Sequence, residues 1–216
     1  MIDSNVSLDL MQFIETSILP RYAEFGRSHG LSHVKRVIDN SLKLAKITGV
    51  NVNMAYTVAA YHDIGMSGPR AIHHITGGKI LAADQRLKRW FQDDQIKVMR
   101  EAIEDHRASS SHAPRNIYGK IVAEADRDLE PEIVFRRTIL FGLENYPDKN
   151  KEEQWNRFVE HMENKYSAHG YITLWIPNSP NEQHLKVIRT YIADKKKLRE
   201  VFDKLYKDET EKQQTP

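Results

Sequence analysis

The segment 52–61, VNMAYTVAAY, constrains the fold more than any other part of the sequence. When it is placed on a helix, its apolar residues lie on nearly every side instead of forming one stripe. Asn51 or Asn53 can cap the amino end of this helix, because an asparagine side chain accepts hydrogen bonds from the free backbone N–H groups there. Such a helix is stable only when other elements surround it. The segment therefore predicts a helix in the middle of the fold.

Most of the remaining sequence also has a helical period. From Leu31 the apolar residues recur three or four positions apart and end before Gly49, which predicts an amphipathic helix. The same reasoning predicts further helices at 76–87, 92–107, 115–125, 131–145, 152–167 and 181–206, with a break inside the last. The run YITLWI at 171–176 has the composition of a short strand, but a single strand has no sheet to join. We therefore expect an all-α fold.

Length and composition favour a single domain. A chain of 216 residues with 40% hydrophobic residues can bury one core of ordinary size, but hardly two independent ones. We expect residues 1–207 to form this domain. Residues 208–216, DETEKQQTP, contain no apolar residue that could pack against it, so we expect a disordered tail there.

Charge and cysteine content exclude several classes of protein. The 32 basic and 30 acidic residues are mixed along the chain, which argues against nucleic acid as a partner. No segment approaches the roughly 20 apolar residues that cross a bilayer, and the amino end lacks the features of a signal peptide. We expect a protein of the cytoplasm with no membrane partner. Because there is no cysteine, any metal must be held by His, Asp, Glu and water.

Three ionisable residues lie beside the apolar stripes of predicted helices. His33 precedes Val37 by one turn, His106 follows Ile103 by three residues, and Asp126 flanks the apolar face of 115–125. Burial of an unpaired carboxylate costs several kcal/mol, on the order of the desolvation penalty of one ion. Imidazoles gathered around a carboxylate from other helices are stable together when a cation lies among them. The pattern therefore predicts a metal site.

The pair His62-Asp63 fits the same interpretation. Neighbouring residues on a helix point in different directions, but at a helix end both side chains can converge on one ion beyond the last turn. The free carbonyl groups at the carboxyl end of a helix also favour a cation there. Gly65 would then let the chain leave the helix in a left-handed conformation.

This set of residues resembles the signature of a known family. His33, the pair His62-Asp63, and Asp126 in VAEADRD are similar, in this order, to the H…HD…D signature of the HD-domain superfamily. The resemblance implies an all-helical bundle around a buried metal site, with extra helices at the carboxyl end. It also implies a metal-dependent phosphohydrolase.

Two further segments extend the resemblance. HHITGGKIL at 73–81 and AIEDHRAS at 102–109 resemble the segments that carry accessory histidines in HD proteins. The resemblance covers residues 26–130 and leaves the helical extension at 131–207 without an implied role. It implies a set of six metal ligands: His33, His62, Asp63, His73, His106 and Asp126. By contrast, His29 is expected to be a polar neighbour at a helix start, and His74 to lie behind the ligands.

In HD families with six ligands, the aspartate of the HD pair bridges two metals about 3.5–4 Å apart. The resemblance therefore implies two divalent ions, drawn from Mn, Fe, Co, Ni, Zn or Mg, with Asp63 in a catalytic role. Many such families carry a lysine shortly after the HD pair, whereas this chain has Met66, Ser67 and Gly68. Phosphate contacts must then come from elsewhere. Arg36, one turn after His33, is the first candidate and a second catalytic residue; the other candidates are Arg70, Lys79, Arg107 and Lys120.

Three functions remain open from the sequence. The first is hydrolysis of a phosphate ester by a metal-activated hydroxide, on a small phosphorylated partner such as a nucleotide or dinucleoside polyphosphate. The second follows from the minority of HD proteins that hold two irons and use O₂ on a small polyol or phosphonate. The third is a non-catalytic, metal-stabilised binding module. The sequence leaves the oligomeric state open.

Overall fold

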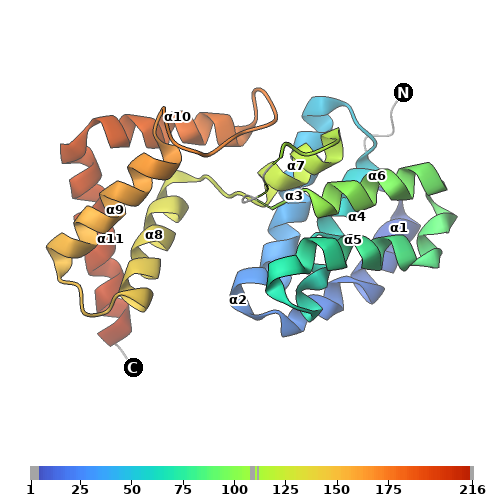
Figure 1. The fold of residues 1–216 in the computed structure, drawn as a ribbon, viewed down its shortest axis with the longest axis horizontal. Helices are drawn as coiled ribbons and strands as arrows, with labels where there is room; N and C mark the ends of the chain where they lie inside the picture. The colour runs from blue at the N-terminus through green and yellow to red at the C-terminus, as the bar shows by residue number, and fades with distance from the viewer. Residues whose placement is uncertain (1–4, 108–109, 111, 215–216) are drawn as a thin grey trace. The chain divides into compact units, whose positions relative to one another are not determined.

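The computed structural model describes residues 5–107, 110 and 112–214 (Figure 1). The part of the chain that it describes is helical and contains no strand, which confirms the all-α prediction. The contacts divide the chain into two compact units, residues 1–127 and residues 128–216. This division falls close to position 130, where the segment covered by the HD resemblance ends. That residues 1–207 form one domain stays a prediction.

The first unit is built from α-helices and 3₁₀ turns. Its elements are α1 (Leu8–Ser17), η1 (Leu19–Glu24), α2 (Gly26–His29), α3 (Leu31–Thr48), α4 (Val52–Tyr61), η2 (Ile64–Ser67), η3 (Arg70–Ile72), α5 (His73–Ala83), η4 (Gln85–Arg89), α6 (Asp93–Glu104) and α7 (Ile117–Ala125). The elements before α3 have no counterpart among the predicted helices.

Helix α4 lies in the centre of the first unit, as its apolar sequence predicts. Every residue of α4 except Asn53 is buried, and the helix packs against α1, α3, α5, α6 and α7. The side chain of Asn51 caps it by accepting hydrogen bonds from the backbone N–H groups of Asn53 and Met54. At the other end, the hydroxyl of Tyr22 donates to the carbonyl of Ala60 at 2.9 Å and fixes the last turn. The residues that follow α4 therefore start from a rigid support.

The reason for glycine at position 65 differs from the sequence-based one. The left-handed conformation belongs to Gly49, which ends α3 with φ 67°, and to Gly26; among the described residues no other glycine has a positive φ. Gly65 instead lies against the start of α5. A Cβ atom at this position would stand 2.0 Å from the carbonyl oxygen of His73 and 2.5 Å from the backbone nitrogen of Gly77. The glycine is required by close packing of backbones.

Gly65→Ala is expected to destabilise the first unit by at least about 2 kcal/mol, because backbone atoms cannot move aside as a flexible side chain can. Gly68→Ala is the matched control, since a Cβ atom there meets nothing nearer than 3.6 Å. Urea titration of both variants, followed by circular dichroism, checks this. Equal midpoints for the two variants would contradict the packing requirement at Gly65.

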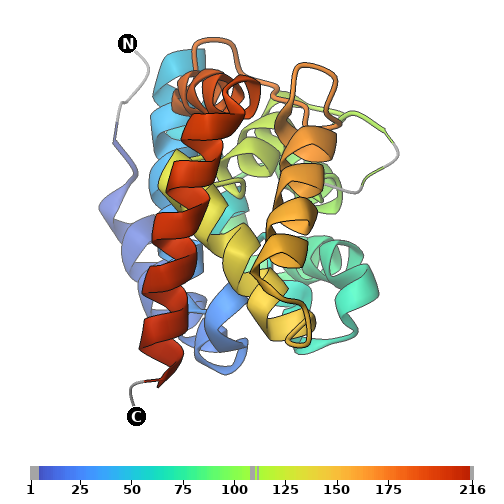
Figure 2. The same cartoon turned by 90° about the vertical axis from the view of Figure 1, so that its left-hand side faces the viewer.

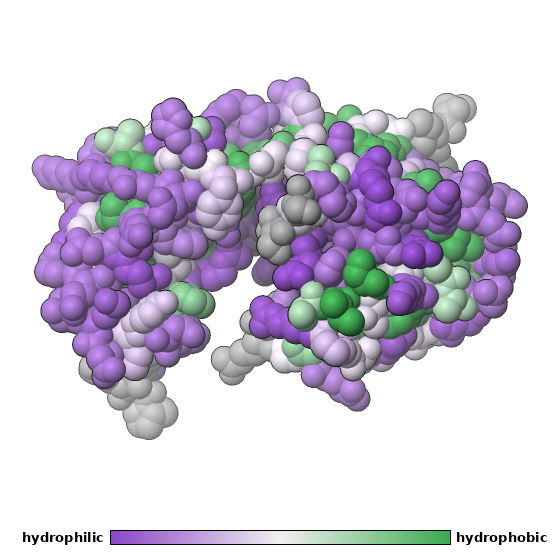
Figure 3. Space-filling model, in the orientation of Figure 1, coloured by the Kyte–Doolittle hydropathy of each residue, from purple (hydrophilic) through white to green (hydrophobic). Residues whose placement is uncertain are grey.

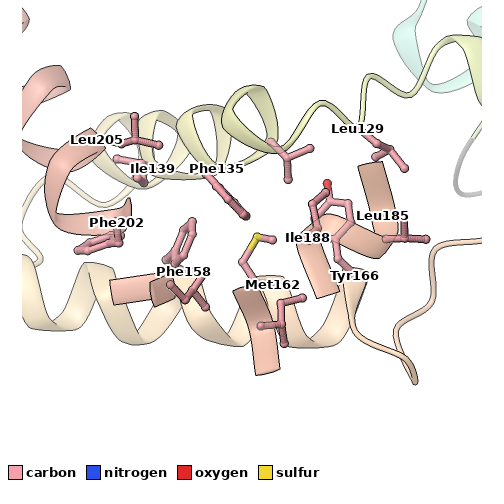
Figure 4. Close-up of a cluster of buried hydrophobic side chains, with 13 residues drawn as sticks. Leu129, Phe135, Ile139, Phe158, Met162, Tyr166, Leu185, Ile188, Phe202 and Leu205 are labelled. Carbon is pink, nitrogen blue, oxygen red and sulfur yellow. The ribbon is translucent and has the colours of Figure 1, made fainter. Parts of the chain in front are cut away.

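The second unit consists of four helices: α8 (Pro131–Asn145), α9 (Lys151–Tyr166), α10 (Pro180–Ala193) and α11 (Lys195–Gln214). α8 packs against the other three, and α10 also packs against α9 and α11 (Figure 2). The core is aromatic and aliphatic. Phe135, Phe158 and Met162 are buried and point into the space between α8 and α9, with Phe202 of α11 beside them (Figure 4). Hydrophilic side chains cover most of the visible face of each unit (Figure 3).

The second unit decides one open question and corrects one prediction. Residues 171–176 form a loop and not a strand, in agreement with the lack of any partner strand among the described residues. Residues 208–214 continue α11 instead of forming a disordered tail, whereas 215–216 lie outside the described residues. Ion pairs stabilise this part of α11, which has no apolar residues. Glu209 is buried, accepts a hydrogen bond from Arg136 and pairs with Lys212 at 2.8 Å.

Candidate metal centre

Asp63 lies at the centre of a cluster of imidazoles just beyond the end of α4. Its side chain is 3% exposed, and its backbone N–H donates to the hydroxyl of Tyr22 at 3.3 Å. Its Oδ1 atom lies 3.2 Å from Nε2 of His73 and 3.5 Å from Nε2 of His106. Its Oδ2 atom faces three other imidazole nitrogens, those of His29 at 2.7 Å, His62 at 3.3 Å and His33 at 3.4 Å. The two oxygens of one carboxylate thus face two separate groups of histidines.

Three of these histidines are fixed by the backbone in the same way. Nδ1 of His62 lies 2.7 Å from the carbonyl oxygen of Ala59, three residues earlier. Nδ1 of His73 and of His106 make the same contact with the carbonyls of Arg70 and Ile103, at 2.8 Å and 2.7 Å. A carbonyl can only accept, so Nδ1 carries the proton in each ring. Nε2, with its lone pair, is then directed at the cluster, as in histidines that bind metals.

His33 and Asp126 complete the cluster from two other helices. His33 lies on the buried face of α3, and its Nε2 is 3.2 Å from Oδ1 of Asp126 and 3.1 Å from Nε2 of His62. Asp126 follows the last residue of α7 and is 30% exposed. All six residues that the HD resemblance implies as ligands therefore meet in one place. They come from five separate segments of the chain.

The donor atoms of this cluster fit divalent cations. Nε2 of His73 and Nε2 of His106 lie 3.3 Å apart, and the Nε2 atoms of His33 and His62 lie 3.1 Å apart. Because Nδ1 carries the proton in both His73 and His106, their Nε2 lone pairs face each other, which is unfavourable unless a positive charge lies beside them. Two groups of three share no residue: His33, His62 and Asp126 in one, and Asp63, His73 and His106 in the other. Imidazole and carboxylate donors suit Mn, Fe, Co, Ni and Zn.

The charges in the cluster are strongly coupled. Burial raises the pKa of Asp63, but the imidazoles of His62, His106, His29 and His33 outweigh this and hold the pKa far below its usual value. Burial likewise raises the pKa of Asp126, but the hydrogen bond from His33 and the neighbouring imidazoles lower it to about 2. Burial lowers the pKa of His33, but Asp126 and Asp63 outweigh this and raise it to about 9. Both carboxylates are therefore anionic and available to a cation at neutral pH.

His29 is a member of the cluster that the sequence analysis placed outside it. Its Nδ1 is 2.7 Å from Oδ2 of Asp63, and together with His33 and Asp63 it forms a third group able to hold an ion. His29 ends α2 and Gly30 separates it from α3, so the two histidines do not lie on one helix. The spacing of four residues between His29 and His33 could nevertheless have indicated in the sequence that His29 belongs to the cluster. His29 is 22% exposed, so solvent reaches the cluster at this residue and at Asp126.

The predicted phosphate-binding residues are distributed unevenly. Arg36 lies at the cluster, with Nη2 3.4 Å from Nδ1 of His33. Arg107 directly follows His106 and donates from Nη1 to the carbonyl of Ala71 at 2.7 Å. The side chains of the other three candidates make no described contact with the cluster. Arg70 contacts His73 only through its backbone carbonyl. Lys79 lies on the exposed side of α5, and Lys120 lies on α7.

Comparison with known proteins agrees with this geometry. Residues 30–129 match the family model of the HD domain. This segment is an HD domain. The match begins one residue after His29 and contains all six of the other cluster residues. HD domains typically bind divalent metals, which agrees with the arrangement of donors.

The HD domain covers slightly less than half of the chain, and α8–α11 lie beyond it. Among solved structures, the chain is similar to the crystal structure of a predicted HD superfamily hydrolase from an uncultured Thermotogales bacterium. The identity is 19% and the TM-score 0.49, over 72% of this chain and 86% of that chain. Comparison with curated proteins gives no match. In the described part of the chain, no helix is long and apolar enough to span a membrane.

Proposed function

We propose that this protein is a metal-dependent phosphohydrolase that acts on a phosphate ester of a small, nucleotide-like molecule. The HD domain supports a metal-dependent hydrolase as the general class. One observation carries the more specific proposal: Oδ1 and Oδ2 of Asp63 face different groups of histidines. A carboxylate in this position can serve two cations at once, and a pair of cations is suited to holding the oxygens of a phosphoryl group.

The residues of the cluster would hold two divalent ions. His33, His62 and Asp126 provide one set of donors, His73 and His106 provide the other, and Asp63 reaches both. When bound, such ions polarise a phosphoryl oxygen and lower the pKa of water, so that water becomes an effective nucleophile near neutral pH. The backbone carbonyls behind His62, His73 and His106 keep the rings oriented through the reaction.

Water is the nucleophile in the proposed reaction. Its oxygen forms the new bond to phosphorus, the ester P–O bond breaks, and the departing oxygen receives a proton. The chain contains no cysteine that could attack in place of water. The water enters on the side of His29 and Asp126, the two most exposed residues of the cluster. Arg36 beside His33 is placed to neutralise the negative charge that gathers on the phosphoryl oxygens.

A direct test is the hydrolysis of simple and nucleoside phosphate esters by the purified protein. We expect phosphate release that EDTA abolishes and that Mn²⁺, Co²⁺ or Fe²⁺ restores after the chelator is removed, because Asp63 and its histidines have no catalytic function without cations. Release that persists unchanged in EDTA would contradict a metal-dependent reaction. Bound metal without hydrolysis of any ester would favour the non-catalytic binding module.

A further inference from the structure

A polar pocket lies in the first unit, on two of the segments that also carry histidines of the metal centre. It has a volume of about 690 Å³ and is lined by the start of α5, the end of α6 and residues of the segment before α7, namely Ser110, His112, Ala113 and Arg115. Two of its lining residues directly follow histidines of the cluster: His74 follows His73, and Arg107 follows His106. The rings of His73 and His74 are 5.6 Å apart. The pocket and the metal centre therefore share the start of α5 and the residues just after α6.

The two carboxylates of the pocket are already neutralised. Asp105 is 2% exposed and accepts hydrogen bonds from the backbone N–H of Arg115 at 2.8 Å and from its guanidinium at 2.9 Å. Glu104 pairs with the same guanidinium at 2.8 Å and with Nε of Arg100 at 2.7 Å. These acids are bound to arginines and are not free to take a cation. The pocket is thus not a second metal site.

Arg107 is the lining residue whose charge has no carboxylate partner among the described residues. Its one described hydrogen bond runs from Nη1 to the carbonyl of Ala71, which fixes the guanidinium but does not neutralise it. Three arginines, at 100, 107 and 115, thus share two carboxylates, and one positive charge remains. In addition, Nδ1 of His74 is buried without a hydrogen-bond partner in the described structure. The pocket therefore offers a fixed positive charge and an unused polar atom.

We infer that this pocket binds a second phosphate of the substrate, next to the phosphoryl group that is attacked at the metal centre, and that Arg107 holds it. A guanidinium binds phosphate oxygens through paired, charge-assisted hydrogen bonds, which a neutral side chain cannot replace. The inference rests on the proposed function and specifies its substrate class: a molecule with two adjacent phosphates, such as a nucleoside diphosphate or triphosphate, instead of a simple monoester.

The test compares a nucleoside 5′-diphosphate with the matching 5′-monophosphate as substrates of the metal-loaded protein. Arg107→Gln is expected to lower kcat/KM for the diphosphate by about 10- to 100-fold, mainly through KM, which corresponds to the loss of hydrogen bonds to a charged group. The monophosphate should change by less than about 2-fold, since it leaves the pocket empty. Lys97→Gln on the exposed face of α6 removes one charge from the same unit and is the matched control. An equal loss for both substrates in Arg107→Gln would overturn the inference.

A binding measurement separates this inference from the proposed function. Inorganic pyrophosphate and orthophosphate are titrated into the protein in EDTA and followed by NMR, so that no catalysis is needed. The inference predicts that pyrophosphate shifts the signals of residues around His74 and Arg107, and that Arg107→Gln weakens this binding at least about 5-fold while Arg107→Lys retains part of it. No perturbation at the pocket in the unaltered protein would overturn the inference, even if ester hydrolysis were observed.

Discussion

Asp63→Ala is expected to remove the metal from the protein and to lower its melting temperature. Asp63 contributes an oxygen to each group of histidines, so its loss leaves neither set of donors with a bridging carboxylate. It also leaves the five imidazoles of the cluster with Asp126 as the one carboxylate described beside them. Removal of one partner from a buried group of paired charges typically lowers the free energy of unfolding by about 3–5 kcal/mol. In a chain of this size that cost lowers the melting temperature by about 6 °C or more.

Elemental analysis and thermal unfolding of the same sample check this prediction. Asp39→Ala is the control, because Asp39 is an exposed carboxylate on a different side of α3 from His33. His73→Gln is the intermediate case, since it damages the group of His73 and His106 and leaves His33, His62 and Asp126 intact together with Oδ2 of Asp63. We expect two ions per chain in the unaltered protein, one in His73→Gln and none in Asp63→Ala. Full occupancy in Asp63→Ala would show that Asp63 is not a ligand.

Arg36→Gln is expected to lower kcat for ester hydrolysis by about one to three powers of ten, which is the range for the loss of one electrostatic donor in a transition state. Metal content should stay at the level of the unaltered protein, because Arg36 contacts His33 through Nδ1 and not through the nitrogen that faces the cluster. Arg36→Lys keeps the charge but not the paired donors, so it should recover only part of the rate.

Steady-state kinetics on one phosphate ester, with metal analysis of each sample, measure this effect. Lys35→Gln is the matched control: Lys35 is the exposed neighbour of Arg36 on α3 and lies on a different side of the helix from His33. If the rate and the metal content of Arg36→Gln fall together, Arg36 acts by holding His33 in place and not by contacting the substrate. An unchanged rate would remove Arg36 from the reaction.

That these residues gather in one cluster could be anticipated from the sequence because each of them is tied to a helix. His33, His106 and Asp126 lie beside apolar stripes, and the helical period therefore orients their side chains. Because the sequence of α4 is apolar on nearly every side, it also predicted that His62 and Asp63, which follow this helix, would lie in the centre of the unit. Which residues of different helices meet could not follow from periodicity alone; the HD resemblance supplied that order.

The predictions that failed or fell short depend on contacts between distant segments. His29 reaches Asp63 across 34 positions of sequence through the short helix α2, which no periodic pattern marks. Gly65 is required by the approach of α5, and glycine alone does not distinguish close packing from a left-handed turn. The extension of α11 past residue 207 is supported by an ion pair between Glu209 and Arg136, which lie 73 positions apart. The pocket at Arg107 likewise becomes visible only when α5 and α6 are placed side by side.

Isotope labelling during turnover tests the proposed function most directly. The protein is loaded with Mn²⁺ or Fe²⁺ and incubated with a phosphate ester in ¹⁸O-water under air, while dissolved O₂ is recorded and the products are analysed by mass spectrometry. A hydrolase that uses water as the nucleophile places one ¹⁸O atom in the released phosphate for each bond broken and consumes no O₂. Incorporation of oxygen from ¹⁸O₂ into the organic product, with matching O₂ uptake, would contradict the phosphohydrolase and favour an oxygenase with two irons at the same residues.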